Sequence, residues 1–183
     1  HENASAAGYF DEIHQTATNI TRAMDEIVWV VNPNYDHLES LAAYIGDFAQ
    51  KFLALAGIRC RLDIPPELPP IPVTSQVRHH LFLCCKEALN NVVKHAQADE
   101  VVLSIHSSDQ QFVITIRDNG HGGDFAAINN STNGRQAARV VAGLGLDGMK
   151  QRMAAINGKF EVSVPRGGGT TVRLTMLFAA EER

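Results

Sequence analysis

Residues 111–123 read QFVITIRDNGHGG, an apolar strand pattern that ends in an acidic residue and a glycine-rich turn. Phe, Ile and Ile recur at every second position of 112–116, the period of a β-strand with one buried face. Asp118 stands at the strand end, and Gly120 and Gly122 follow it. Glycines let a backbone approach a flat ligand closely, and a carboxylate there accepts a hydrogen bond from an exocyclic amine. A tight turn without a ligand remains an alternative explanation.

A second polar cluster precedes this strand, in residues 86–95, which read KEALNNVVKH. Its chemically active members are four, three and one positions apart, so on a helix they share one edge while the apolar residues face the core. These members are Glu87, Asn91, Lys94 and His95. A carboxylate, an amide, an ammonium and an imidazole in one row suit a phosphate-bound Mg²⁺, which takes few hard oxygen ligands from protein. A solvated polar face would look the same.

A third cluster, Gly143-Leu144-Gly145-Leu146, lies where a regular pattern returns and leads into a predicted helix that ends at Gly158. The apolar residues that mark this helix are Leu146, Met149, Met153 and Ile156. Glycines before a helix N-terminus expose backbone N–H groups to an anion, and the helix dipole favours that anion. An ordinary loop-to-helix turn is the alternative. Residues 120–143 are rich in Gly, Asn, Ser and Ala without a sustained period, which predicts a lid or a disordered insertion.

The rest of the chain predicts an α+β fold. Apolar residues recur at coiled-coil spacing through 9–31, and Asn32-Pro33 stops that helix. Asp36 with Glu39 predicts a capping box for the next helix, and Gly57 a helix end. Further predicted elements are strands at 58–64, 100–107, 111–117, 160–164 and 170–178, and a helix from about 75 to 96. Sequential hairpins favour a mixed, mostly antiparallel sheet covered on one face by helices, a two-layer sandwich.

Composition excludes several classes of protein. The net charge of -4 argues against nucleic acid as a partner, because a phosphate backbone needs a clustered basic face. The apolar runs are too short to span a bilayer, and the N-terminus has no secretion leader. Cys60, Cys84 and Cys85 lie among apolar residues at no disulfide or metal-site spacing, which indicates buried thiols in a reducing compartment.

Together these motifs resemble the GHKL ATPases, which comprise histidine kinases, the gyrase B subunit, MutL and the ninety-kilodalton heat-shock chaperone. The segments KEALNNVVKHAQA, DNGHGG, GLGLDGMKQRM and GGGTTVRL are most similar to histidine kinases of the nitrate-sensor and DesK-like group. The resemblance covers about residues 23–178. It implies the Bergerat ATP-binding fold, with ATP and Mg²⁺ bound between the helices and a lid.

The resemblance also assigns roles to single residues. It implies that Asn91 ligates Mg²⁺, that Glu87 polarises or positions a reacting group, and that Lys94 and His95 face the phosphates. Asp118 would bind the adenine amine, with Gly120 and Gly122 allowing close approach and Thr170 supporting Asp118. The phosphates would lie on the third cluster, at Gly143, Leu144, Gly145 and Leu146.

The resemblance implies a cytoplasmic enzyme that transfers phosphate from ATP to a histidine of a dimerisation domain, and onward to a response regulator. Residues 1–33 match a second dimerisation helix and linker, and 34–183 the catalytic domain with its lid at about 120–143. The phosphoacceptor helix is missing from this pattern, since His14 lacks the acidic residue that should follow it. We therefore expect a homodimer in the full-length protein, with membrane contact only through parental segments.

Three alternatives remain at the level of sequence. The N-terminal helix could fold back on the domain core, since apolar stripes are usually core. The chain could be a serine-protein kinase of the anti-sigma-factor type, although the helix before Pro33 argues against this. It could also be a nucleotide-binding interaction module without turnover, which the intact Glu87, Asn91 and Asp118 argue against.

Overall fold

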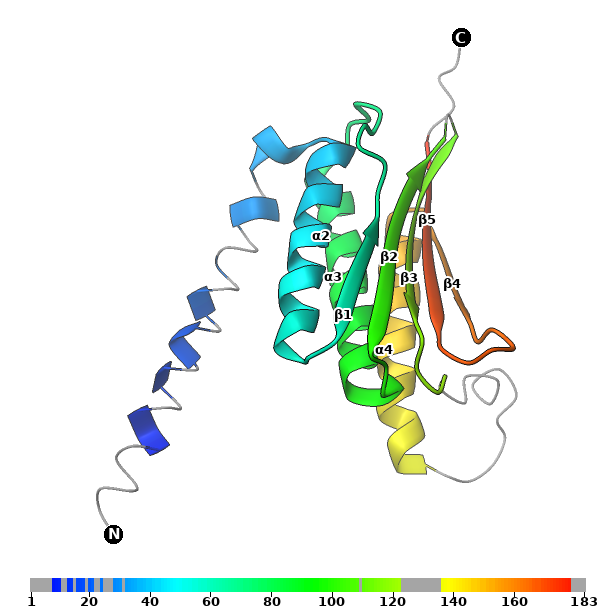
Figure 1. Cartoon of the computed structure of the whole chain (residues 1–183). Coiled ribbons are helices and arrows are strands. Elements are labelled where there is room, and N and C mark those ends of the chain that lie inside the picture. Colours follow the sequence, from blue (N-terminus) through cyan, green and yellow to red (C-terminus); the bar gives the residue numbers. More distant parts are fainter. Residues whose placement is uncertain are drawn as a thin grey trace.

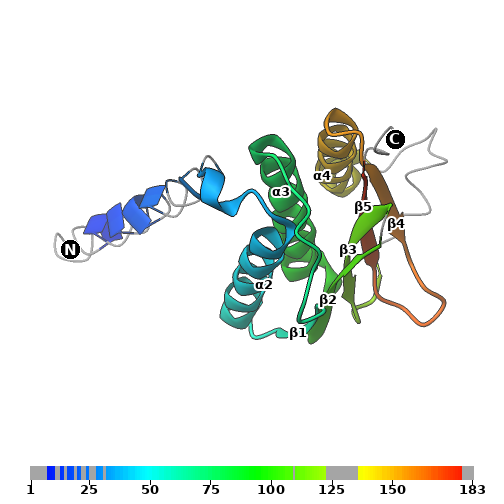
Figure 2. The same ribbon diagram turned by 90° about the horizontal axis from the view of Figure 1, so that it is seen from above.

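A computed structural model of the chain shows a layer of helices packed on one face of a β-sheet (Figures 1 and 2). The described residues are 8–10, 13, 14, 16–18, 20, 21, 24, 28–30, 32–108, 110–122 and 136–178, with side chains from 145 onward in the last range. The elements are η1 (Pro33–Tyr35), α2 (Leu38–Leu55), β1 (Arg59–Asp63), α3 (Ser75–Asn91), η2 (Val92–Ala96), β2 (Glu100–Ser107), β3 (Gln111–Asp118), α4 (Gln136–Ala155), β4 (Lys159–Ser163) and β5 (Thr171–Leu177).

The sheet has five strands in the order β1-β2-β3-β5-β4. β1 pairs in parallel with β2, and the other three pairings are antiparallel, so the sheet is mixed and mostly antiparallel as predicted. In β2 and β3 every second residue is buried, which is the alternation expected when one face of a sheet carries the core. The α+β fold class is therefore confirmed.

The core lies between the helical layer and the sheet. α2 contributes the face that carries Leu41, Ile45 and Ala49, all essentially without solvent exposure. α3 adds Leu81, Phe82, Cys84, Cys85, Ala88 and Leu89, and the sheet adds Leu103, Ile105, Ile114 and Leu174. Figure 2 shows α2, α3 and α4 side by side along the sheet. Gly57 adopts a positive φ of 72° directly after α2, which confirms the predicted helix end.

The start of α2 differs from the prediction. The N-cap residue is His37, and its side chain makes no capping hydrogen bond. The expected capping box does not form because the carboxylate of Asp36 pairs with the guanidinium of Arg78 on α3, with Nη1 and Oδ1 2.7 Å apart. A long-range ion pair has replaced a local cap.

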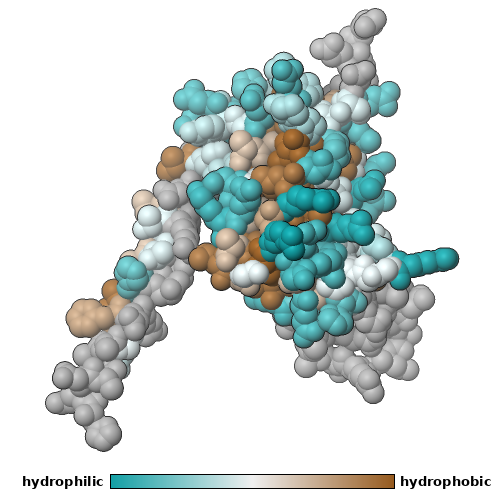
Figure 3. All heavy atoms as spheres, in the orientation of Figure 1, coloured by the Kyte–Doolittle hydropathy of each residue, from teal (hydrophilic) through white to brown (hydrophobic). Residues whose placement is uncertain are grey.

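The described residues between 8 and 30 are helical and lead away from the sheet and the other helices (Figure 1). As far as Val28 their large apolar side chains are exposed, and Figure 3 shows hydrophobic residues at the surface along this arm, whereas Trp29 is buried. These side chains are Tyr9, Phe10, Ile13, Ile20, Met24 and Val28. The described part of the helix up to Val28 therefore does not fold back on the core, while its end at Trp29 packs there. None of the described helices is both long enough and apolar enough to cross a membrane.

Candidate functional site

Asp118 closes β3 as a buried carboxylate with only 3% of its surface exposed. Its Oδ1 accepts a hydrogen bond of 2.9 Å from the backbone N–H of Gly120, and its own N–H donates to the carbonyl of Thr170 at 3.0 Å. Its Oδ2 has no hydrogen-bond partner among the described residues. A buried carboxylate with one oxygen held and the other available is suited to accept a hydrogen bond from a ligand amine.

The turn after Asp118 is clamped between two other segments. The N–H of His121 donates to the carbonyl of Ala96 at 3.0 Å, and the N–H of Gly169 donates to the carbonyl of Gly120 at 2.6 Å. A Cβ on Gly120 would collide with the carbonyl oxygen of Ala96. Gly120 is thus needed for contact between two backbones, a reason additional to the predicted approach of a ligand.

Gly122 and Thr170 also lie beside the turn. Gly122 has a positive φ of 70°, and a Cβ there would stand 2.9 Å from Cγ1 of Val164. Thr170 is buried and supports Asp118 through its backbone carbonyl. The structure therefore brings together Asp118, Gly120, Gly122 and Thr170 at one end of the sheet.

Sequence reasoning overlooked Asn119, which anchors the turn to β2. Its Oδ1 accepts from the backbone N–H groups of Asp99 and Glu100, each at 3.1 Å, and its Nδ2 donates to the side chain of Asp99 at 2.5 Å. An Asn directly after a functional residue in a turn was the available signal, since asparagine amides readily bond nearby backbone groups. These bonds hold Asp118 at the end of the sheet.

Glu87 and Asn91 lie one helical turn apart on α3, and both side chains are half-buried. α4 approaches them at Gly145, where an added Cβ would collide with Oε1 of Glu87 and stand 3.6 Å from Nδ2 of Asn91. Two side chains of α3 thus lie beside the third glycine-rich cluster. Ala96, which contacts the Asp118 turn, follows Asn91 by five residues, roughly 7 Å along a helix axis.

Lys94 and His95 lie beyond α3, in the π-helical turn η2, and both are exposed. The predicted row on one edge assumed α-helical spacing, but a π-helical turn pairs residues five apart and changes the direction of the following side chains. Glu87 and Asn91 therefore lie together on α3, whereas Lys94 and His95 lie on η2.

The third cluster differs most from the prediction. Gly143, Leu144 and Gly145 lie inside α4, because that helix begins at Gln136, seven residues before Gly143. Residues 136–142 read QAARVVA, and their alanines and arginine favour a helix. Backbone groups within a helix are already paired, so these glycines do not form a free helix N-terminus in this structure. Leu146 belongs to the core, and the predicted lid lies mostly outside the described residues.

A hollow of about 300 Å³ lies beside Glu87 and is lined by residues from α2, α3 and α4. Arg152 of α4 and Lys86 of α3 supply its positive charges.

The pKa of His80 is lowered by burial and by the nearby charges of His79 and Arg152. Burial raises the pKa of Cys84 to about 12, so this thiol stays protonated at neutral pH. Cys84 and the equally buried Cys85 are therefore packing residues and not nucleophiles.

Curated relatives match a large part of this chain. It is 32% identical over 138 residues to the nitrate/nitrite sensor protein NarX of Escherichia coli strain K12. The matched segment covers 75% of this chain and 20% of NarX. It is 28% identical over 122 residues to the sensor histidine kinase LiaS of Bacillus subtilis strain 168, covering 67% of this chain and 31% of LiaS. The chain therefore spans less than a third of the length of either relative.

Solved structures share the fold. The full-length ShkA structure in complex with AMPPNP superposes with a TM-score of 0.62 at 18% identity, covering 94% of this chain and 39% of that one. The histidine kinase domain of the blue-light activated kinase of Erythrobacter litoralis EL346 has a TM-score of 0.56 at 21% identity, covering 74% of this chain and 60% of that one.

A family model describes more than half of the chain. Residues 76–180 match the model of the histidine kinase-, DNA gyrase B- and HSP90-like ATPases. This range includes Glu87, Asn91, Asp118, Gly145 and Thr170, which the fold gathers around the ends of α3 and β3. The chain therefore belongs to the family of histidine kinase-, DNA gyrase B- and HSP90-like ATPases, as its motifs predict.

Proposed function

We propose that the chain binds Mg-ATP and transfers the terminal phosphoryl group to a histidine of a dimerisation domain, as the catalytic part of a two-component sensor kinase. The observation that carries this proposal is the buried Asp118 with one unpaired oxygen, set in a turn that backbone hydrogen bonds hold from two sides. The family match and the sensor kinases among the relatives support it.

The adenine base would lie against the Asp118 turn. Oδ2 of Asp118 would accept a hydrogen bond from the exocyclic amine, while the bond from Gly120 keeps Oδ1 occupied. A buried carboxylate rejects ligands that lack a donor at this position, because its unpaired oxygen would then stay desolvated without a partner. Adenine should therefore be preferred over guanine, which carries a carbonyl at the corresponding ring position.

The residues around Gly145 fit Mg²⁺. Glu87 and Asn91 carry hard oxygens on neighbouring turns of α3. Oε1 of Glu87 and Nδ2 of Asn91 are the side-chain atoms near Gly145, and a flip of the Asn91 amide would turn its Oδ1 to the same place. An ion there would be held jointly by these protein oxygens and by phosphate oxygens. Bound Mg²⁺ would neutralise negative charge on the triphosphate during transfer.

The partners follow from the same proposal. Residues 1–33 would be the end of a dimerisation region, in a homodimer whose parent receives the signal elsewhere, and a response regulator would take the phosphate. The catalytic domain would work in the cytoplasm, anchored only through parental segments. The division near residue 33 stays a prediction, and Trp29, four residues before it, is already buried in the domain core.

Equilibrium calorimetry with ATP tests the adenine contact. Asp118→Asn should weaken ATP binding at least tenfold, since it replaces an acceptor oxygen by an amide and a hydrogen bond to a charged group is worth about 1.5–3 kcal/mol. Asp63→Asn, an exposed aspartate on the edge strand β1, is the matched control. Equal ATP affinity of Asp118→Asn and the parent would refute the assignment.

Two adjacent asparagines allow a sharp test of the metal site. Asn91→Ala should remove the Mg²⁺ dependence of ATP binding, whereas Asn90→Ala should keep it. Both residues are half-buried on α3, but only Asn91 is close to the position of a Cβ on Gly145. The comparison of calorimetric titrations with and without Mg²⁺ decides the point, and identical behaviour of the two variants contradicts the proposal.

The acceptor is tested by supplying it in trans. A fragment that contains a matching acceptor helix, mixed with this chain and labelled ATP, should become labelled with the acid-labile, base-stable chemistry of phosphohistidine. Acid-stable label would indicate a serine acceptor instead. ATP binding without any transferred label would favour the non-catalytic interaction module.

A further inference from the structure

Arg78 is the one charged side chain of the described residues that is completely buried, yet it takes no part in the proposed nucleotide site. It lies near the start of α3, about two and a half turns before Glu87. Burying a guanidinium is costly unless it is paired and hydrogen-bonded, so its contacts need a structural or functional explanation.

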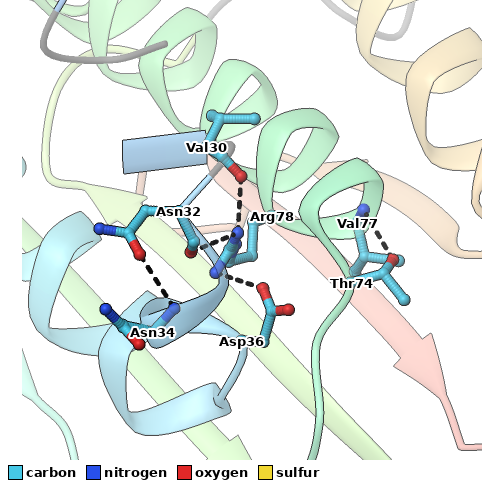
Figure 4. A network of polar contacts seen from close by, with 7 residues as sticks. All are labelled: Val30, Asn32, Asn34, Asp36, Thr74, Val77 and Arg78. Carbon is cyan, nitrogen blue, oxygen red and sulfur yellow. Dashed lines mark hydrogen bonds and ion pairs between the residues drawn. The ribbon is translucent and has the colours of Figure 1, made fainter. Parts of the chain in front are cut away.

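The guanidinium holds the segment that joins the N-terminal helix to the domain (Figure 4). Nη2 donates to the carbonyl of Val30 at 2.6 Å and to that of Asn32 at 3.2 Å. Nη1 lies 2.7 Å from Oδ1 of Asp36 as an ion pair. The last carbonyls of a helix lack donors within the helix, and Arg78, 48 residues away, supplies one to Val30. The carbonyl of Asn32, just before η1, also accepts from the backbone N–H of Tyr35 at 3.2 Å.

Aromatic packing closes the same joint. Trp29 is buried, and its ring stacks on Tyr44 of α2 with centroids 3.8 Å apart and planes 6° from parallel. The guanidinium carbon of Arg78 lies 5.4 Å from the centroid of the Trp29 ring, within the range of a cation–π contact. Phe82, one helical turn after Arg78, packs against Trp29 and Tyr44.

We propose that Arg78 is a positioning residue, which clamps the end of the N-terminal helix to the ATPase domain and so sets the direction in which that helix leaves it. Its three polar contacts reach both sides of Pro33, in Val30, Asn32 and Asp36, so the helix end cannot turn relative to α3 without breaking at least one of them. The consequence for phosphoryl transfer rests on the proposed function, because the acceptor would approach through the dimerisation helices.

Arginine is required for this clamp because it donates in two directions at once. A lysine has the charge for Asp36 but lacks a planar fork that reaches two carbonyls as well. The Nε and Nη1 of Arg78 are buried without a hydrogen-bond partner among the described residues, so Nη1 holds Asp36 as an ion pair and Nη2 supplies both hydrogen bonds. The clamp therefore depends on the terminal nitrogens. Its loss leaves the carbonyl of Val30 without this donor and Asp36 without its ion pair, while the carbonyl of Asn32 keeps the bond from the N–H of Tyr35.

The fluorescence of Trp29 reports the state of the clamp, because the sequence contains a single tryptophan. In the parent chain we expect emission at short wavelength and weak quenching by acrylamide, since the indole is buried. Arg78→Met should shift the emission to longer wavelength and raise the quenching constant several-fold. Arg78→Lys should give an intermediate result. Arg59→Met, which removes an exposed arginine that pairs with Glu100, should leave both readouts unchanged.

A count of reactive thiols separates release of the clamp from unfolding. A folded domain should hide Cys84 and Cys85, which are completely buried. If Arg78→Met exposes these two thiols, the domain has unfolded, and the Trp29 fluorescence of Asp36→Asn is then the deciding measurement. The side chain of Asp36 is 41% exposed, so its replacement removes only the ion pair. A shielded Trp29 in the folded variants would overturn the proposal. Calorimetry of the parent with ATP is independent of it, so a failure of nucleotide binding and a failure of the clamp are distinguishable.

Discussion

Replacing Gly120 by alanine should destabilise the domain by about 3–5 kcal/mol. The new Cβ would collide with the carbonyl oxygen of Ala96 and stand 3.0 Å from its Cβ. Neither group can move freely, since Ala96 is buried and its carbonyl accepts from His121. Moving the turn instead breaks that bond and the bond from Gly169, at about 1 kcal/mol each, and overpacking adds about 1–3 kcal/mol.

Urea unfolding followed by circular dichroism measures this loss, and a scan of temperature should show a fall in Tm of roughly 6–20 °C for a domain of this size. Gly167→Ala is one control, because nothing lies within 4 Å of its new Cβ. Gly57→Ala is a second control, because its new Cβ would also meet open space but the backbone there has a positive φ of 72°. Its free energy of unfolding should fall by only about 1–2 kcal/mol, through backbone strain. If Gly120→Ala is no less stable than Gly57→Ala, the close packing of the Asp118 turn on η2 is wrong.

Three further predictions concern the helical layer. Gly145→Ala should change Tm little, because the Cβ meets the mobile end of Glu87, but it should weaken Mg²⁺-dependent ATP binding by displacing that carboxylate; unchanged calorimetric titrations would contradict this. A thiol reagent at pH 8 should modify at most the half-buried Cys60 in the native chain and all three cysteines in urea, since burial raises the pKa of Cys84 to about 12. His80 should titrate below 6.5 by NMR, so the folded state binds fewer protons than the unfolded chain and stability should fall as pH drops through 6.5, then level off below the folded pKa; His80→Gln should flatten that slope.

Most of the fold could be predicted from local periodicity. β2 and β3 begin at the predicted residues, and Gly57 ends α2 as expected, because alternation and a positive φ depend on near neighbours. The parallel pairing of β1 with β2 could not be predicted from period alone. It depends on contacts between residues about 41 apart, such as Arg59 with Glu100.

The errors arose where distant residues or weak propensities decide. Asp36 fits a capping box, but the buried charge of Arg78 has more to gain from its carboxylate than a helix start does. α4 begins at Gln136, before the predicted helix, because the alanines of residues 136–142 favour a helix that continues through Gly143 and Gly145. For the site, the pairing of Glu87 with Asn91 followed from helical spacing, whereas the π-helical turn that carries Lys94 and His95 has no recognised signature in residue spacing.

The parallel pair at the edge of the sheet constrains the helix that carries Glu87 and Asn91. β1 and β2 run in the same direction, so the chain must travel back along the sheet between them, and α3 is that return path. Three residues, 97–99, join the end of η2 to β2, which leaves almost no slack at the nucleotide end. The segment that joins β1 to the start of α3, residues 64–74, is longer and rich in proline. An extra residue inserted near Ala98 should therefore displace the site, while one inserted beside the exposed Glu67 should be absorbed far from it.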